Sequence, residues 1–183
     1  MITTIISNNC TGAAISHDMG MEFLSPTINL QILPEEFPKF CKDIKTYMTA
    51  DLREYKNVSA KHSAMLYKMF GGIPDMPLGL CGDIMVCFQH YDSFLEARAK
   101  WDERKWRVRY DEIGYLFHAR GSEYKEELES FIRLGLPHSL ALAEGFSCDG
   151  AVRFDPPEGG NGFSAVNGKV AVVWAYDWKE WMK

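Results

Sequence analysis

The polar run SNNCTG near the amino terminus carries the first side chains that could do chemistry. Asn8 and Asn9 offer amide donors and acceptors, and Cys10 and Thr11 add a thiol and a hydroxyl, all without charge. Such uncharged groups suit a sugar, a ribose or a phosphoester. Asparagines are equally typical of turns, and a small cysteine often only packs. Gly12 belongs to no GxGxxG or P-loop pattern, so the run has no standard phosphate-binding fingerprint.

Cys10 also allows a different chemistry, nucleophilic catalysis with His17 or His90 as the base. A nucleophilic thiolate needs a lowered pKa, which a helix N-terminus or a nearby cation supplies. The sequence demonstrates neither, and a lone cysteine is more often inert. A cysteine-dependent hydrolase or acyltransferase is therefore an alternative to a sugar-binding site.

Acid–base candidates occur where apolar runs end. His90 and Tyr91 close the run DIMVCFQH, where a histidine can act as general base or donate to a phosphate. The alternative is a histidine that caps the next helix. Glu144 ends another apolar run and is the carboxylate best placed for proton transfer. Asp83 begins its run, which favours a structural role. With Cys10, His90 and Glu144 are the catalytic candidates.

Cations for an anionic substrate lie in the segment KWDERKWRVR and at Arg120. Basic and aromatic residues in alternation can bind nucleotides or phosphates. More often they form a solvated helix face with one tryptophan buried. No His/Cys/Asp group has metal-ligand spacing, so no metal site is predicted, although a nucleotide sugar could bring a divalent cation with it. The predicted substrate contacts are Asn8, Asn9, Thr11, Ser25, Tyr91, Lys100, Arg104 and Arg120.

A sheet must bring these residues together, and hydrophobic patterning predicts its strands. Helices are predicted over 35–48, over 93–107 behind the capping box of Ser93 and Glu96, and from Ser122 to Gly135. Residues 51–69 are assigned to an exposed strand followed by a loop, and 149–168 to a Gly/Pro-rich loop. Strands are predicted at residues 3–7, 27–33, 83–90, 113–118, 138–143 and 169–176.

Strands that alternate with helices predict βαβ units and one α/β domain over residues 1–183. The predicted fold is three-layered, with a mostly parallel sheet and flanking helices, Rossmann-like in the broad sense. In such sheets ligands bind beyond the carboxyl ends of the strands. The rule directs attention to the residues after Ser7, Gln89, Phe117 and Ala143.

Composition limits the partners. The formal net charge is -5 and the pI is about 5.5, which argues against nucleic acid. No run approaches the roughly 20 apolar residues of a membrane span, and the amino terminus has no basic region of a secretory signal. Five cysteines without a CxxC pair indicate free thiols. These features predict a cytoplasmic protein.

Three stretches resemble the bacterial family called the domain of unknown function numbered 1919. They are TIISNNCTGAAI at 4–15, SPTINLQI at 25–32, and residues 77–113. The likeness extends to about Ala143. The chain departs from the family pattern at TGA after Cys10 and at HARGS after Phe117, which lacks an acidic residue and a cysteine. Within the third stretch the matching residues are Asp83, His90, Tyr91, Ala97, Lys100, Trp101, Arg104, Arg107 and Asp111.

Family members are often labelled exopolysaccharide or capsular polysaccharide biosynthesis proteins. The resemblance therefore implies an enzyme of surface-polysaccharide assembly, a transferase that acts on an activated sugar or a glycan intermediate. Its partner would be a small sugar or a nucleotide sugar, with Asn8, Asn9 and Ser25 orienting it, His90 as base, and Arg104 or Arg120 at the phosphate. Besides the Cys10 enzyme, a non-catalytic scaffold protein of the same machinery is the remaining alternative.

Overall fold

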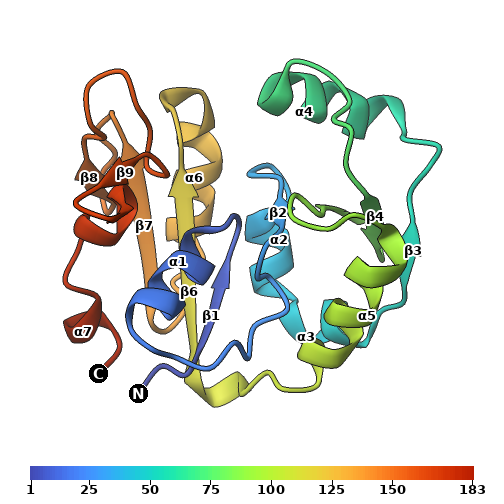
Figure 1. Ribbon diagram of the computed structural model, residues 1–183, viewed down its shortest axis with the longest axis horizontal. Helices are drawn as coiled ribbons and strands as arrows, with labels where there is room; N and C mark the ends of the chain where they lie inside the picture. Colours follow the sequence, from blue (N-terminus) through green and yellow to red (C-terminus); the bar gives the residue numbers. More distant parts are fainter.

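The computed structural model describes residues 1–183, and its centre is a four-stranded parallel sheet in the order β1-β6-β7-β8 (Figure 1). Each strand runs parallel to its neighbour, and all four carboxyl ends share one edge. The predicted α/β class is confirmed. The strands are β1 (Thr4–Ser7), β6 (Ile113–Ala119), β7 (Ser139–Glu144) and β8 (Val152–Phe154).

Alternating side chains give this sheet two buried faces. Ile5 and Leu116 point to one face, whereas Ile6 and Phe117 point to the other, the period of two that a strand imposes. The first face packs against α1 (Thr11–Asp18), the 3₁₀ turn η3 (Ala171–Trp174) and α7 (Trp178–Trp181). The second packs against α2 (Phe37–Lys42) and α6 (Lys125–Arg133). The parallel sheet is therefore the middle of three layers, as predicted.

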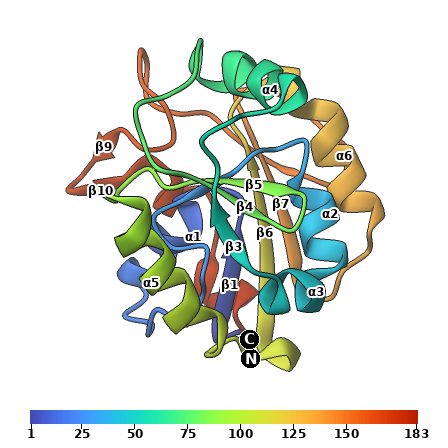
Figure 2. The same cartoon turned by 90° about the vertical axis from the view of Figure 1, so that its right-hand side faces the viewer.

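A second, antiparallel sheet lies beside the first, in the order β2-β5-β4-β3 (Figure 2). The predicted strand 83–90 belongs here and not to the parallel sheet, because its partners β2 and β4 both run antiparallel to it. Its helices are α3 (Ile44–Thr49), α4 (Ala60–Phe70) and α5 (Phe94–Lys105). Its strands are β2 (Gln31–Ile32), β3 (Leu52–Glu54), β4 (Leu78–Cys81) and β5 (Ile84–Cys87).

The two sheets join where β1 ends. The Ile32 N–H donates to the Asn8 carbonyl at 2.8 Å, which sets β2 against the loop after β1. Behind this junction Phe37 packs edge-on against Phe117, with ring centroids 5.6 Å apart, and stacks on Phe131 at 5.8 Å. One core of aromatic side chains therefore serves both sheets, and the end of β5 reaches the carboxyl edge of the parallel sheet.

Several predicted elements differ from the structure for local reasons. Strand 27–33 shrinks to two residues because Asn29 takes a left-handed turn conformation, with φ of 62°. Helix 35–48 breaks at Asp43, whose backbone is not helical. The assignment of 51–69 missed α4, which Ser59 caps by accepting the His62 N–H and which ends at Gly71. The helix from 93 is confirmed, with the Ser93 oxygen accepting the Glu96 N–H at 3.2 Å.

The carboxyl-terminal region departs most from the prediction. Residues 169–176 form only the short strand β10 (Lys169–Val170), paired with β9 (Ala165–Val166), before η3 begins. Their apolar run is explained by burial of 171–173 against α1 and not by a strand. The predicted loop 149–168 contains β8 and β9. The two chain ends meet, with the Ile2 N–H donating to the Met182 carbonyl at 2.9 Å. No helix is long and apolar enough to cross a membrane.

Candidate functional site

The carboxyl edge of the parallel sheet converges on His118. Strands β6 and β7 pair His118 with Leu142, so that the imidazole points toward Glu144, the last residue of β7. The Nε2 atom lies 2.8 Å from Oε2 of Glu144, and Nδ1 lies 2.8 Å from the Thr11 hydroxyl at the start of α1. His118 is 1% exposed and Glu144 8%. A hydroxyl, an imidazole and a carboxylate from three elements therefore form one hydrogen-bonded chain.

The two asparagines after β1 hold this chain in place. The His118 N–H donates to Oδ1 of Asn8 at 2.9 Å, and the Nδ2 groups of Asn8 and Asn9 both donate to the His118 carbonyl. Oδ1 of Asn9 accepts the Thr11 N–H at 3.0 Å. Both amides are buried. Their side chains bond to the protein instead of facing solvent, which fixes His118 and Thr11 relative to each other.

The environment sets the protonation of the pair. Burial lowers the pKa of His118, and nearby Arg120 adds to the lowering against the opposing effect of Glu144. Burial alone would raise the pKa of Glu144, but its bond to His118, the Gly162 N–H and Arg120 together hold that pKa below its usual value. At neutral pH the pair is a neutral imidazole beside an ionised carboxylate. Nε2–H then donates to Glu144, and Nδ1 accepts from the Thr11 hydroxyl.

A turn formed by residues 161–164, with sequence NGFS, closes over the pair. The Gly162 N–H donates to Oε1 of Glu144 at 3.0 Å. The Phe163 ring lies 6.0 Å from the His118 ring and 5.3 Å from the Arg120 guanidinium carbon. Arg120 follows β6, is exposed, and has no hydrogen bond or ion pair to any protein group. A free cation therefore lies at the mouth of a buried His–Glu pair.

Cys10 is half-buried at the N-cap position of α1, on the same edge. Its thiol donates weakly to Oε1 of Gln89 at 3.5 Å. Burial raises the pKa of Cys10 to about 11, although Arg120 opposes the rise. At pH 7 only about one thiol in ten thousand is then ionised. The geometry favours a neutral thiol over a catalytic thiolate.

The remaining predicted contacts lie outside this cluster. His90 is exposed after β5, and no hydrogen bond joins it to the chain of His118. The Tyr91 hydroxyl accepts from Arg104 at 3.0 Å. Lys100 pairs with Glu103 on the outer face of α5. Ser25 is buried, and its hydroxyl accepts the Thr27 N–H at 3.1 Å.

Asp83 has the structural role that was predicted. Its carboxylate accepts the Tyr47 hydroxyl at 2.9 Å and also pairs with Lys39. Both partners belong to the helices after β2, so the contact fastens the turn between β4 and β5 to those helices. No three His, Cys, Asp or Glu side chains are close enough together to hold a metal ion.

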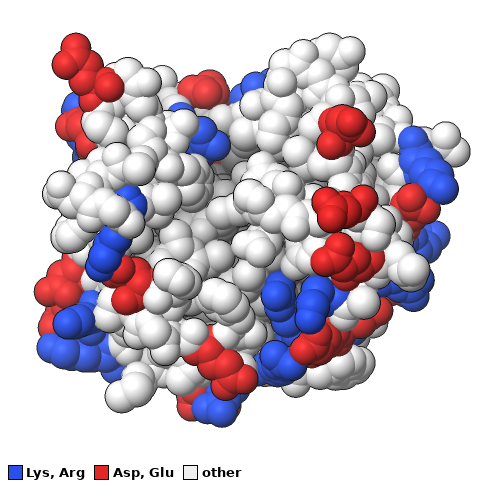
Figure 3. Space-filling model, in the orientation of Figure 1, with Lys and Arg blue, Asp and Glu red and all other residues white.

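The surface has two further concave regions that could bind a ligand. Figure 3 shows the face hollowed between the half that carries β7 and the half that carries α4, with walls mostly of uncharged atoms. A separate pocket of about 500 Å³ lies between α1 and the β10 segment, lined by His17, Asp18 and Lys169 among others. Its lysine is already paired with Asp18. The carboxyl edge, where Arg120 is free, is the stronger candidate.

Sequence reasoning missed His118 as a functional residue, together with Gly162 and Phe163. His118 is the last residue of the predicted strand 113–118 and directly follows Phe117, where the rule on strand ends points, but of the residues there only Arg120 was predicted as a site residue. His118 could have been identified from the sequence, because a histidine at the end of an apolar strand is expected to be buried, and a buried polar side chain needs a hydrogen-bond partner. Glu144 was predicted. The turn 161–164 has no sequence signal beyond Asn161-Gly162, a pair typical of turns.

The residues that match a known protein family include part of this site. The family model described as "Domain of unknown function (DUF1919)" matches residues 2–143. A Haemophilus influenzae protein named "Uncharacterized protein" is 29% identical over 131 residues, which are 72% of this chain and 56% of that protein. The chain thus spans little more than half the length of this relative. Asn8, His118 and Arg120 lie within the matched residues, whereas Glu144 and Phe163 lie beyond them.

Proposed function

The chain belongs to the DUF1919 family, and from this premise we propose that it is a transferase of surface-polysaccharide assembly that acts on an activated sugar or a glycan intermediate. The pathway comes from the resemblance of the sequence to proteins labelled for exopolysaccharide synthesis. The class of reaction comes from the residues at the carboxyl edge of the parallel sheet.

One observation carries the proposal: Arg120, a cation that forms no ion pair with any carboxylate of the protein, lies near the buried pair of His118 and Glu144. Open α/β sheets bind ligands at this edge. An unpaired guanidinium offers up to five N–H donors in a fork that matches phosphate oxygens. A carboxylate that is ionised at neutral pH can accept a proton a short distance away. A phosphate-linked sugar and a hydroxyl acceptor need these two functions.

In the proposed reaction the acceptor hydroxyl attacks the anomeric carbon of the donor sugar, and the bond between that carbon and the phosphate oxygen breaks. The proton of the hydroxyl passes to Glu144, and the phosphate leaves with the bonding electrons, its charge met by Arg120. His118 does not take up this proton: its Nε2–H keeps the 2.8 Å hydrogen bond to the Glu144 carboxyl and holds that group in place. The Thr11 hydroxyl continues to donate to Nδ1, so the chain of hydrogen bonds persists before and after the proton transfer.

Asn8 and Asn9 act in this mechanism by holding His118, and Ser25 by holding the loop before β2. His90, which the sequence predicted as the base, is assigned here to contact with the outer part of the substrate, because it is exposed and follows β5. A divalent cation, if the donor brings one, would be bound mainly by the donor's own phosphates.

The test is a thermal-shift screen of the whole chain against nucleotide sugars, free nucleotides and sugar phosphates, with and without Mg²⁺ or Mn²⁺. A ligand at 100 times its Kd adds about 2.7 kcal/mol, a shift on the order of 5–10 °C for a chain of this size. Arg120→Ala should remove the shift. Arg133→Ala is the matched control, an exposed arginine on α6 that pairs only with Glu129.

Turnover of the ligand that shifts the protein then separates transfer from simple binding. Glu144→Gln should keep most of the ligand shift and lose transfer. A flat response of the wild type to every nucleotide sugar and sugar phosphate, or an equal shift in Arg120→Ala, would overturn the proposal.

A further inference from the structure

The turn 161–164 is rigid, and it lies beyond the residues that the family model matches. Within the turn, the Phe163 N–H donates to Oδ1 of Asn161 at 2.8 Å, and the Ser164 N–H donates to the Asn161 carbonyl at 2.9 Å. From outside, the Val172 N–H donates to the Gly162 carbonyl at 2.8 Å. The turn therefore presents the Phe163 ring in one place.

Gly162 anchors the same turn to the His–Glu pair. Its N–H binds Glu144, and a Cβ at this position would lie 2.8 Å from Oε2 of Glu144 and 2.9 Å from Cε1 of His118. No other residue fits without displacing the pair or the turn. The position of Phe163 is thus fixed relative to the site and not only relative to its own loop.

The Phe163 ring contacts the Arg120 guanidinium. The guanidinium carbon lies 5.3 Å from the ring centroid, within the range of a cation–π contact. Arg120 makes no ion pair and no hydrogen bond with the protein. A carboxylate partner would neutralise its charge and occupy its donors. An aromatic ring restrains the group through the ring face and leaves both charge and N–H donors available.

We propose that Phe163 is a positioning residue, which holds Arg120 ready for the phosphate group of the substrate and so sets the affinity for that group. The inference rests on the proposed function, because it takes Arg120 as the phosphate contact. The part of the site that the family model matches supplies the cation, and the turn beyond the match orients it.

The experiment compares Phe163→Leu, which keeps apolar bulk but removes the ring face, with Phe163→Tyr, which keeps it. Phe23→Leu is the matched control, an exposed phenylalanine in the loop after α1. Two quantities are measured on the full chain: the NMR shift of Arg120 Nε–H, which the ring current of Phe163 displaces, and the affinity for inorganic pyrophosphate by calorimetry. Phe163→Leu should lose the displaced shift and bind pyrophosphate about two- to five-fold more weakly. Phe163→Tyr and Phe23→Leu should keep both.

The outcomes separate this inference from the proposed function. If Arg120→Ala binds pyrophosphate as the wild type does, or the wild type does not bind it, the proposed phosphate contact fails. If Arg120→Ala weakens binding but Phe163→Leu does not, the role of Phe163 alone fails. An Arg120 Nε–H shift unchanged in Phe163→Leu overturns the inference whether or not pyrophosphate binds.

Discussion

The chain contains two buried histidine–glutamate pairs of nearly identical geometry, and only one of them lies at the candidate site. His118 meets Glu144, and His62 meets Glu36, each with Nε2 2.8 Å from a carboxylate oxygen. All four residues are at most 8% exposed. The distance and burial of a His–Glu pair therefore do not distinguish a functional site from a structural one.

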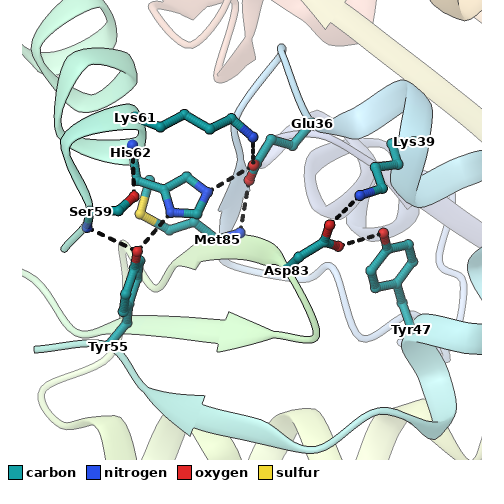
Figure 4. A network of polar contacts seen from close by, with 9 residues as sticks. All are labelled: Glu36, Lys39, Tyr47, Tyr55, Ser59, Lys61, His62, Asp83 and Met85. Atoms are coloured by element: carbon teal, nitrogen blue, oxygen red, sulfur yellow. Dashed lines mark hydrogen bonds and ion pairs between the residues drawn. The ribbon is translucent and has the colours of Figure 1, made fainter. Parts of the chain in front are cut away.

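The surroundings distinguish them. Glu36 accepts hydrogen bonds from His62, from Lys61 at 3.1 Å and from the Met85 N–H at 2.8 Å (Figure 4). The other nitrogen of His62 meets the Tyr55 hydroxyl at 2.9 Å. This network fastens α4 to β5 and to the start of α2, and the cation that faces it is already paired.

The pair of His118 and Glu144 lies near Arg120, an exposed arginine that is not paired with any acid. In both pairs the second histidine nitrogen meets a hydroxyl, so this bond does not distinguish them. An arginine without an acidic partner beside such a pair therefore indicates chemistry more than the pair itself does.

The largest expected effect is on the structural pair. Glu36→Ala leaves His62, Lys61 and the Met85 N–H without their acceptor, so we expect a loss of about 3–5 kcal/mol in the free energy of unfolding. Urea unfolding followed by circular dichroism measures it. Glu54→Ala, at an exposed glutamate of β3, is the control and should change stability by less than about 0.5 kcal/mol. A loss for Glu36→Ala no greater than that of the control would remove the structural role of this pair.

Glu144→Ala should cost less, about 1–3 kcal/mol, because it leaves two hydrogen-bond donors, His118 Nε2–H and the Gly162 N–H, without their acceptor, whereas Glu36→Ala leaves three and one of them is charged. The same urea experiment measures the difference between the two alanine variants. If Glu144→Ala proves the more costly of the two, the contrast between the two networks is wrong.

Acid should act through His118. Its pKa is lowered in the fold, so below about pH 6.5 the unfolded chain binds a proton that the folded chain does not. Stability is then fully present above that pH and falls as the pH is lowered, by up to about 2 kcal/mol between pH 7 and pH 5. Urea midpoints across this range should fall less in His118→Gln than in the wild type. His138→Gln, at an exposed histidine, should follow the wild type. Equal slopes in His118→Gln and the wild type would contradict the neutral state of His118.

The sequence was sufficient to predict where several strands lie, but not how the strands pair or where helix α4 lies. Strands 113–118 and 138–143 are apolar runs, and such runs predict buried strands. The carboxyl edge of the sheet, with Arg120 and Glu144, could therefore be located from the sequence. The pairing partners could not, because whether strand 83–90 joins the parallel sheet depends on contacts with β2 and β4 that are distant in sequence. Helix α4 was missed because only two of its residues are buried, which leaves a weak apolar pattern.

The functional residues show the same limit. In the hydrogen-bonded chain, Thr11 is 107 positions from His118, and His118 is 26 positions from Glu144, so no local sequence pattern indicates either contact. Sequence reasoning found the members that follow strands and passed over the one inside a strand. Asn8 and Asn9 were predicted to bind a ligand, because the sequence does not distinguish an amide that hydrogen-bonds to the protein backbone from one that binds a sugar.

The smallest effect on stability is expected for substitution of Cys10. Alkylation of Cys10 tests whether reagents reach the carboxyl edge of the sheet, where His118 and Glu144 lie. Four of the five cysteines are buried and Cys10 is half-buried, so iodoacetamide should modify the folded protein at Cys10 first. Because burial raises its pKa to about 11, its rate should still rise about tenfold per pH unit from pH 7 to 9.5, where an unperturbed thiol levels off near 8.5. Mass spectrometry of peptides from timed samples follows the rate of alkylation, and Cys10→Ser is the blank.

We expect Cys10→Ser to change the free energy of unfolding by less than about 1 kcal/mol, because the substitution removes only the weak hydrogen bond between the Cys10 thiol and Gln89. A rate that levels off below pH 8 would instead reveal a thiolate stabilised by Arg120, and the cysteine enzyme would then replace the transferase as the better account of this edge.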